Sequence, residues 1–116
     1  GSMWRAGALL AFGSDGPVEV PNPFHTLDAA VHRTRPDGTP EGGWQPAEKL
    51  TVEQALWAHT IGPHRAAGQD DVLGRLAPGM LADFVVVDRA SDSPTGRLAD
   101  TGVEMTVVGG EIRFSR

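Results

Sequence analysis

The chain has 116 residues, of which 40% are hydrophobic and 22% are charged, and its formal net charge is −5. This length allows one domain at most, and the composition is ordinary for a soluble globular protein. The negative charge gives no electrostatic footprint for nucleic acid or for anionic membranes, and no apolar run approaches the ~20 residues of a spanning helix. The absence of cysteine excludes disulfides, thiolate metal sites and cysteine nucleophiles, and it fits a cytoplasmic protein.

The N-terminal segment is predicted to contain one buried strand. Gly1-Ser2-Met3 looks like an expression-vector scar and is excluded from fold reasoning. The small and apolar run from Ala6 to Phe12 predicts a buried strand, and it ends abruptly at the polar turn Gly13-Ser14-Asp15-Gly16-Pro17. The strand would therefore deliver a polar residue at its C-terminal end.

The next element is predicted to be a helix. Asn22 is a favourable N-cap and Pro23 a favourable first helical residue, so we expect a helix from here to about Arg33. Residues 34–46 are polar and rich in glycine and proline, which predicts a long loop with Trp44 as its one anchor.

A second helix is indicated by a capping box, because Thr51 is followed three residues later by Gln54. We expect Gly62-Pro63 to end this helix, and a short helical turn to follow over His64 to Ala67.

The C-terminal part is predicted to be β-structure. Pro78-Gly79 is typical of a type II turn, and the continuous apolar run from Phe84 to Val87 favours a strand covered on both faces. Gly109-Gly110 separates the β-prone runs Glu104 to Val108 and Glu111 to Phe114, which predicts a hairpin. An isolated hairpin is only marginally stable, so we expect it to pair with the strand at 83–87.

Asp15 is the first candidate for chemistry. In a (β/α)₈ barrel the side chains just beyond each strand's C-terminal end face the active site, so a carboxylate here could bind a metal or act as a general base. The alternative is that Asp15 merely satisfies turn amides before Gly16-Pro17.

The four histidines do not predict a metal site. His25 and His32 are seven residues apart on the first helix, about 10 Å along its axis. His59 and His64 lie on either side of Gly62-Pro63, and His59 is interpreted as a packed helix residue. Asp70-Asp71 is interpreted as a solvated acidic doublet, because no further calcium ligands follow at suitable spacing.

An ordered set of motifs resembles the family-3 amidohydrolases, a group of metal-dependent enzymes. The set begins with Gly13-Ser14-Asp15-Gly16-Pro17-Val18 and Pro21-Asn22-Pro23, and continues with Ala29-Ala30-Val31-His32-Arg33, Leu50-Thr51-Val52-Glu53-Gln54-Ala55-Leu56 and Thr60-Ile61. It ends with the stretch Gly74-Arg75-Leu76-Ala77-Pro78-Gly79-Met80-Leu81-Ala82-Asp83-Phe84-Val85-Val86-Val87-Asp88. The chain departs from the family pattern at Gly16, where tryptophan is expected.

This resemblance implies an α/β fold: the last strand and following helices of a (β/α)₈ barrel, plus a small antiparallel sheet from the family's β-sandwich. Residues 4–73 would be the barrel remnant, 74–116 the sandwich strands with the hairpin, and 1–3 the scar. Asp15 then matches the aspartate after the eighth barrel strand, which binds the metal, takes a proton from the metal-bound water and passes it to the leaving group.

The same resemblance implies the function of the parent enzyme, which is hydrolysis of an amide-type carbon–nitrogen bond in a small molecule with a divalent metal, zinc by expectation. The family's His-x-His pair and its other metal ligands lie upstream of the residues present. With only Asp15 supplied, we expect the isolated chain to be inactive and to bind zinc weakly at best. The alternative is a non-catalytic self-associating module, or one half of a split protein.

The predicted strand over Ala6 to Phe12 also suggests self-association, because its barrel neighbours would be absent and both edges unpaired. We therefore expect a homodimer or swapped oligomer, with no nucleic-acid or membrane partner. The alternative is that this segment folds as a helix.

Overall fold

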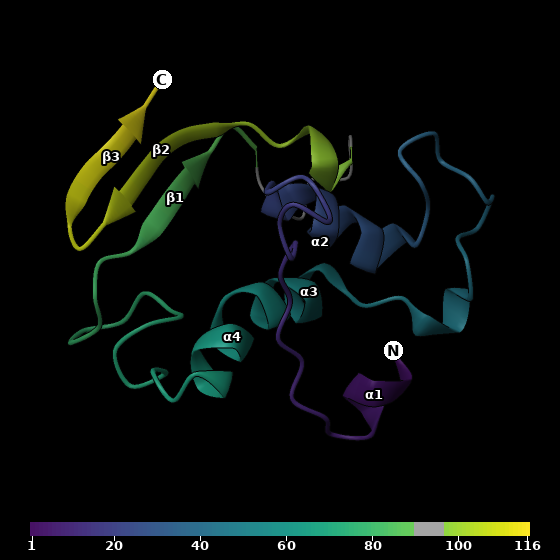
Figure 1. The fold of residues 1–116 in the computed structure, drawn as a ribbon, viewed down its shortest axis with the longest axis horizontal. Coiled ribbons are helices and arrows are strands. Elements are labelled where there is room, and N and C mark those ends of the chain that lie inside the picture. Colours follow the sequence, from purple (N-terminus) through teal and green to yellow (C-terminus); the bar gives the residue numbers. More distant parts are fainter. Residues whose placement is uncertain (90–96) are drawn as a thin grey trace.

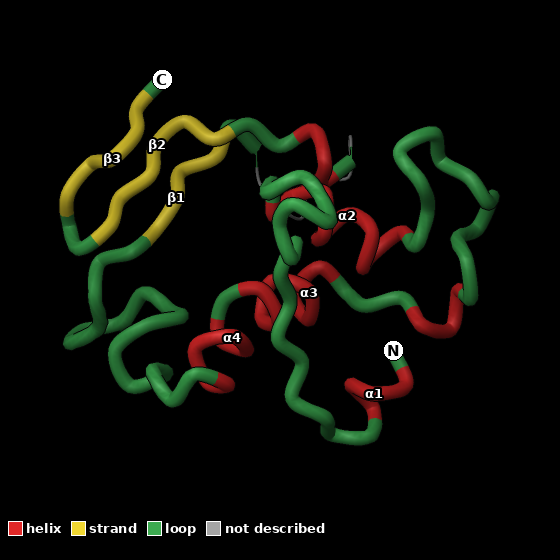
Figure 2. Tube along the Cα trace, viewed as in Figure 1, coloured by secondary structure: helices red, strands yellow, loops and turns green. Residues whose placement is uncertain are grey.

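The computed structural model describes residues 1–89 and 97–116. Its helices are α1 (Ser2–Arg5), α2 (Pro23–His32), η1 (Pro46–Glu48), α3 (Val52–His59), α4 (Ile61–Ala66) and η2 (Leu98–Asp100), where η marks a 3₁₀ helix. Its strands are β1 (Phe84–Val87), β2 (Val103–Val108) and β3 (Glu111–Ser115). The sheet lies to one side of the helices (Figures 1 and 2). None of the helices in the described ranges is long and apolar enough to cross a membrane.

The two predicted helices begin where their caps indicate. The side chain of Asn22 accepts a hydrogen bond of 3.0 Å from the backbone N–H of Phe24, and Pro23 opens α2. In α3 the capping box is complete, because Gln54 N donates to Thr51 Oγ1 at 3.2 Å and Thr51 N donates to Gln54 Oε1 at 3.0 Å. The structure confirms both predicted helix starts. Both could be predicted from sequence because each cap depends only on contacts within a few residues.

The expected end of the second helix is wrong. α3 ends at His59, and Gly62 and Pro63 lie inside the following helix α4 instead of terminating α3. The backbone of Thr60, at φ −111° and ψ −73°, separates the two helices. Pro63 is tolerated there because it occupies the first turn of α4, where a backbone N–H has no partner within the helix.

The predicted hairpin is confirmed. β2 and β3 are antiparallel, Val108 pairs with Glu111, and Gly109-Gly110 forms the turn with φ of 60° and 80°. β1 pairs with β2 on the other side, with Phe84 opposite Val107, so the strand order is β1-β2-β3.

The segment around β1 confirms the predicted turn but not the predicted burial. Met80 N donates to Ala77 O at 3.1 Å and Gly79 has a φ of 88°, as a type II turn requires. The expectation that both faces of β1 are covered is wrong for the described chain, since Val85 is 50% exposed and Val86 is 43% exposed. Three strands alone form one layer, and no second layer lies over them in the described residues.

The prediction of a strand over Ala6 to Phe12 is also wrong. This part of the chain is extended but belongs to no sheet, and it does not form the alternative helix. A strand needs a neighbouring strand to complete its hydrogen bonds. Here the neighbours are helices instead: Phe12 N donates to the carbonyl of Ala58 at the end of α3, at 2.8 Å.

Residues 1–3, which were set aside from fold reasoning as an expression scar, contact the rest of the fold. Ser2 and Met3 are part of α1, and Ser2 donates from its N–H and its hydroxyl to the Glu48 carboxylate at 2.7 and 2.9 Å. Trp4 of α1 packs edge-on against Trp57 of α3, with 5.5 Å between ring centroids.

The loop after α2 is fixed at the surface rather than in the core. Trp44 is 60% exposed, and the Arg33 guanidinium lies over its ring at 5.0 Å. Arg33 Nε also donates to Trp44 O at 2.7 Å. The predicted anchor of residues 34–46 is therefore a stacked pair open to solvent on one side.

The apolar core forms where the helices meet. Its buried members are Leu27, Leu50, Ala55 and Leu98, and Leu10 and Phe12 are among the partly buried side chains packed against them. The core thus joins α2, α3, η2 and the extended N-terminal segment.

Gly62 gives a test of how closely this extended segment packs on α4. A Cβ at position 62 would lie 2.0 Å from the Leu10 carbonyl oxygen, so the two backbones could not keep their contact. Alanine favours helix over glycine by about 1 kcal/mol, yet we expect Gly62→Ala to lower the free energy of unfolding by about 1–3 kcal/mol through overpacking. Urea denaturation followed by circular dichroism measures this.

Gly13→Ala is the matched control, because a Cβ there meets nothing within 4 Å and the residue has no positive φ. We expect a change within about 0.5 kcal/mol for this variant. Equal effects of the two substitutions would contradict a tight contact between residues 10 and 62.

Candidate functional site

Asp15 lies at the end of the extended N-terminal segment, where the chain turns. Its backbone adopts the left-handed conformation with φ of 51°, which aspartate tolerates better than most residues. Its carbonyl accepts a hydrogen bond of 2.9 Å from Val18 N, and Glu19 N donates to Ser14 O at 3.3 Å, closing the turn. The side chain of Asp15 is exposed. The carboxylate is therefore accessible to a ligand.

The extended segment has two different faces. Exposure alternates along residues 8–14, with Leu10 and Phe12 partly buried and Leu9 and Ala11 exposed. Alternation with a period of two is the side-chain pattern of a strand that has one covered face. The helices cover one face, and the described chain leaves the other face open. This arrangement keeps strand-like geometry up to the residue before Asp15.

The donor set around Asp15 fits one ligand of a divalent metal site, but not a complete site. An aspartate oxygen is a common zinc ligand, and tight sites use about three protein ligands. Within the described residues no three His, Asp or Glu side chains lie together in a way that could hold a metal ion. Within these residues Asp15 therefore belongs to no cluster of three metal-ligating side chains.

His59 is a packed residue, as the sequence suggested, and it lies under the segment that leads to Asp15. Its ring meets Phe12 edge-on at 5.8 Å between centroids. Its Nε2 is buried and has no hydrogen-bond partner in the described part of the chain. Burial lowers the pKa of His59 below its usual value of 6.5, because a charged imidazolium would lose its hydration there.

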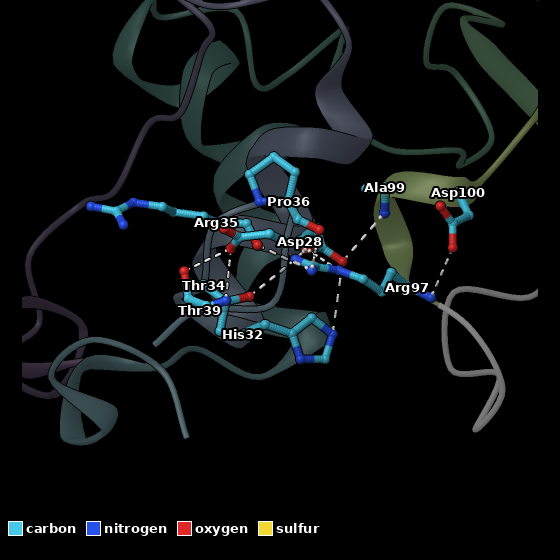
Figure 3. Close-up of polar contacts among 10 residues, drawn as sticks. Asp28, His32, Thr34, Arg35, Pro36, Thr39, Arg97, Ala99 and Asp100 are labelled. Atoms are coloured by element: carbon cyan, nitrogen blue, oxygen red, sulfur yellow. Dashed lines mark hydrogen bonds and ion pairs between the residues drawn. The ribbon is translucent and has the colours of Figure 1, made fainter. Parts of the chain in front are cut away.

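Asp28 and Arg97 form a polar cluster that sequence reasoning missed (Figure 3). Asp28 of α2 is almost fully buried, at 2% exposure, and Arg97 donates to its carboxylate from both Nε and Nη2. The backbone N–H of Ala99 donates to Asp28 Oδ1 at 3.4 Å, and His32 Nε2 lies 3.8 Å from the same oxygen.

The guanidinium of Arg97 is also bound by the loop after α2. Its Nη2 donates to Thr34 Oγ1 at 3.0 Å, and its Nη1 donates to the carbonyls of Arg35 and Pro36 at 3.1 and 3.2 Å. Figure 3 shows these groups converging on one guanidinium from two parts of the chain. A planar group with five donors suits such a convergence of oxygens.

Two effects act on the Asp28 carboxyl in opposite directions. Burial works to raise its pKa, whereas the hydrogen bonds from Arg97 and Ala99 and the positive charge of Arg97 lower it, and the result is a pKa below 3.8. The aspartate is therefore ionised at neutral pH and held by its partners. No local sequence signal could find this pair, because 69 residues separate its members.

A hollow of about 550 Å³ lies between this cluster and the turn that follows Asp15. Its lining includes Glu19 and Val20 from the turn, His25 from α2, and Arg35 and Asp100. Charges of both signs therefore line the hollow.

Removing Asp28 tests the cluster. We expect Asp28→Ala to lower the free energy of unfolding by about 2–4 kcal/mol at pH 7, because Arg97 loses its buried partner. The folded-state pKa lies below the unfolded value, so the stabilisation is present above about pH 4 and is lost as the pH falls further. Urea denaturation at pH 7 and pH 3 should show the difference between wild type and variant shrinking.

Asp70→Ala is the matched control, since it removes the exposed ion pair of Asp70 with Arg65. Exposed pairs contribute about 1 kcal/mol or less. If both substitutions had the same small effect, the Asp28 cluster would not stabilise the fold as argued.

The burial of His59 predicts that the stability of the fold depends on pH in the mildly acidic range. Since its pKa is lower in the folded state than in the unfolded chain, stability is complete above pH 6.5 and falls as the pH drops below that value. We expect His59→Leu to reduce the loss of stability between pH 7 and pH 5. His25→Leu, at an exposed position, should leave the loss unchanged, and a wild-type slope in His59→Leu would refute the burial argument.

Comparison with known proteins places the chain in a family. A profile of the amidohydrolase family matches residues 1–114. Protein LONG AFTER FAR-RED 3 of Arabidopsis thaliana is 41% identical over 110 residues, which are 95% of this chain and 18% of that protein. An N-substituted formamide deformylase of Arthrobacter pascens is 34% identical over 116 residues, which are 99% of this chain and 21% of that protein.

A solved structure supports the fold. The amidohydrolase from Thermotoga maritima superposes with a TM-score of 0.66 at 24% identity, over 99% of this chain and 25% of that one. The chain thus spans about a fifth of the length of the curated relatives it matches. The match over nearly every residue shows that the chain belongs to the amidohydrolase family.

Proposed function

We propose that the chain is the C-terminal part of a metal-dependent enzyme that hydrolyses amide-type carbon–nitrogen bonds of a small molecule in the cytoplasm. The observation that carries the proposal is the position of Asp15. Its exposed carboxylate ends a segment whose covered face packs on α3 and α4 and whose other face is open. The deformylase among its relatives supports a substrate with a carbon–nitrogen bond.

Asp15 is the residue to which we assign the chemistry. We propose that one carboxylate oxygen binds a divalent metal, zinc by expectation, and that the carboxylate accepts a proton and passes it to the leaving group. A bound divalent metal supplies a water that is acidic near neutral pH. The exposed carboxylate is free to meet both partners, because its backbone, rather than its side chain, closes the turn.

The second candidate function is a non-catalytic module, either self-associating or one half of a split protein. It is favoured by the finding that no three metal-ligating side chains lie together in residues 1–89 and 97–116. Both candidates agree that the isolated chain should not hydrolyse amides, so activity of the chain alone cannot separate them.

A chimera separates them. The residues of the Arthrobacter pascens deformylase that align with this chain would be replaced by it, since the two align over 116 residues. We expect the chimera to bind zinc and to hydrolyse N-substituted formamides, and Asp15→Ala in the chimera to lower kcat by 100-fold or more, on the order of a lost acid–base group. Steady-state kinetics and metal analysis measure the two properties.

Asp70→Ala in the same chimera is the control, because it removes another carboxylate far along the chain. A folded, active chimera indifferent to Asp15→Ala would refute the role of Asp15. Titration calorimetry of the isolated chain gives a second test: a submicromolar one-to-one zinc site that Asp15→Ala abolishes would show that the chain completes a site by itself.

A further inference from the structure

The segment that leads to Asp15 is attached to the helices at Leu10 and Phe12. The backbone of Leu10 lies against α4, since a Cβ at Gly62 would be 2.0 Å from the Leu10 carbonyl oxygen. Two residues later, Phe12 N donates to the Ala58 carbonyl of α3 at 2.8 Å, where the segment passes that helix (Figure 1). The path of the backbone is therefore fixed to within a few residues of Asp15.

The side chain of Phe12 is held by the ring of His59. The two rings meet edge-on, with 5.8 Å between their centroids and 78° between their planes, which is a favourable arrangement for aromatic side chains. His59 Nε2 is buried and has no hydrogen-bond partner within residues 1–89 and 97–116. Phe12 has no polar group, so the imidazole meets it as an aromatic surface.

Phe12 and Asp15 belong to opposite sets of side chains along the segment. Residues 8, 10, 12 and 14 are half-buried, whereas residues 9, 11, 13 and 15 are exposed. A shift of an extended chain by one residue exchanges the two sets. Such a shift would bring Ala11 or Gly13 against His59, and the loss of the Phe12 ring from that position would leave a void. The ring contact therefore opposes the shift.

We propose that Phe12 and His59 are positioning residues for Asp15. Their ring contact fixes the register of the segment and so presents the Asp15 carboxylate on the face that the helices leave uncovered. The importance of this presentation for hydrolysis rests on the proposed function. A misplaced proton acceptor lowers kcat because the reacting groups are no longer aligned, whereas contacts that bind the substrate elsewhere, and with them KM, are preserved.

Thiol labelling of this chain tests the register without any enzyme activity. The chain has no cysteine, so Ser14→Cys and Asp15→Cys each introduce one thiol, the first in the half-buried set and the second in the exposed set. We expect iodoacetamide to label the Asp15→Cys variant about fivefold faster or more, because its thiol is more accessible. Adding Phe12→Ala should bring the two rates to within about twofold of each other. Mass spectrometry measures the rates, and circular dichroism checks that each variant folds.

His59→Ala removes the other ring and should have the same effect on the labelling ratio, which keeps the test valid if Phe12→Ala does not fold. Val107→Ala is the control, because it truncates a buried side chain of β2 that belongs to the sheet and not to the core around Phe12. It should leave the ratio unchanged. A ratio that neither ring substitution alters, or one that Val107→Ala alters equally, would overturn the proposal.

The deformylase chimera tests the effect on chemistry. We expect Phe12→Ala and His59→Ala each to lower kcat about tenfold or more while KM stays within about threefold. Because the two rings act through one contact, the double variant should lose only about as much as either single variant, whereas independent effects would multiply. His59→Phe keeps an aromatic ring and should retain kcat to within about twofold.

Steady-state kinetics on N-substituted formamides decides between these outcomes. Losses of kcat that multiply in the double variant, or a fall in kcat for Val107→Ala as large as that for Phe12→Ala, would contradict a positioning role. An inactive chimera with the unsubstituted chain would count against the proposed function instead, and the labelling ratio would still decide whether the ring contact fixes the register.

Discussion

The ion pair between Asp28 and Arg97 joins α2 to η2, the short helix that precedes strand β2. η2 packs against α2 at this point, and η2 leads directly toward β2. A buried carboxylate is costly unless its charge is matched and its oxygens are hydrogen-bonded. Arg97 meets both needs and also binds the loop after α2, so one side chain orients three segments. This cluster and Leu98 in the adjacent core hold η2 against α2 just before β2 begins.

The parts of the fold that could be predicted from sequence depend on neighbours within a few residues. The caps at Asn22 and Thr51 and the turn at Gly109-Gly110 belong to this class, and the structure confirms all three. The cluster at Asp28 could not be predicted, because it forms only when a residue 69 positions away is placed against α2. The predicted end of the second helix at Gly62-Pro63 was wrong for a related reason. The effect of a proline on a helix depends on which turn of the helix the proline occupies.

The segment that carries Asp15 shows why a strand cannot be identified from its residues alone. The run from Ala6 to Phe12 has the apolar pattern of a strand, and residues 8–14 alternate in exposure as a strand does. What it lacks in the described chain is a neighbouring strand, and the backbone N–H of Phe12 instead donates to Ala58 of α3. Sequence therefore predicted an extended apolar run that ends in a polar turn at Asp15, whereas the burial of the run and the hydrogen bonding of its backbone depend on what lies beside it.

The edge-on contact between Trp4 and Trp57 has an optical consequence. Two indole rings 5.5 Å apart couple their electronic transitions, so separation of α1 from α3 would alter the near-ultraviolet signal of both. Trp44 is exposed and stacked with Arg33, and its emission reports on a different region, the loop after α2. The chain's three tryptophans therefore give two intrinsic spectroscopic reporters, and the attachment of the N-terminal helix can be followed without any added label.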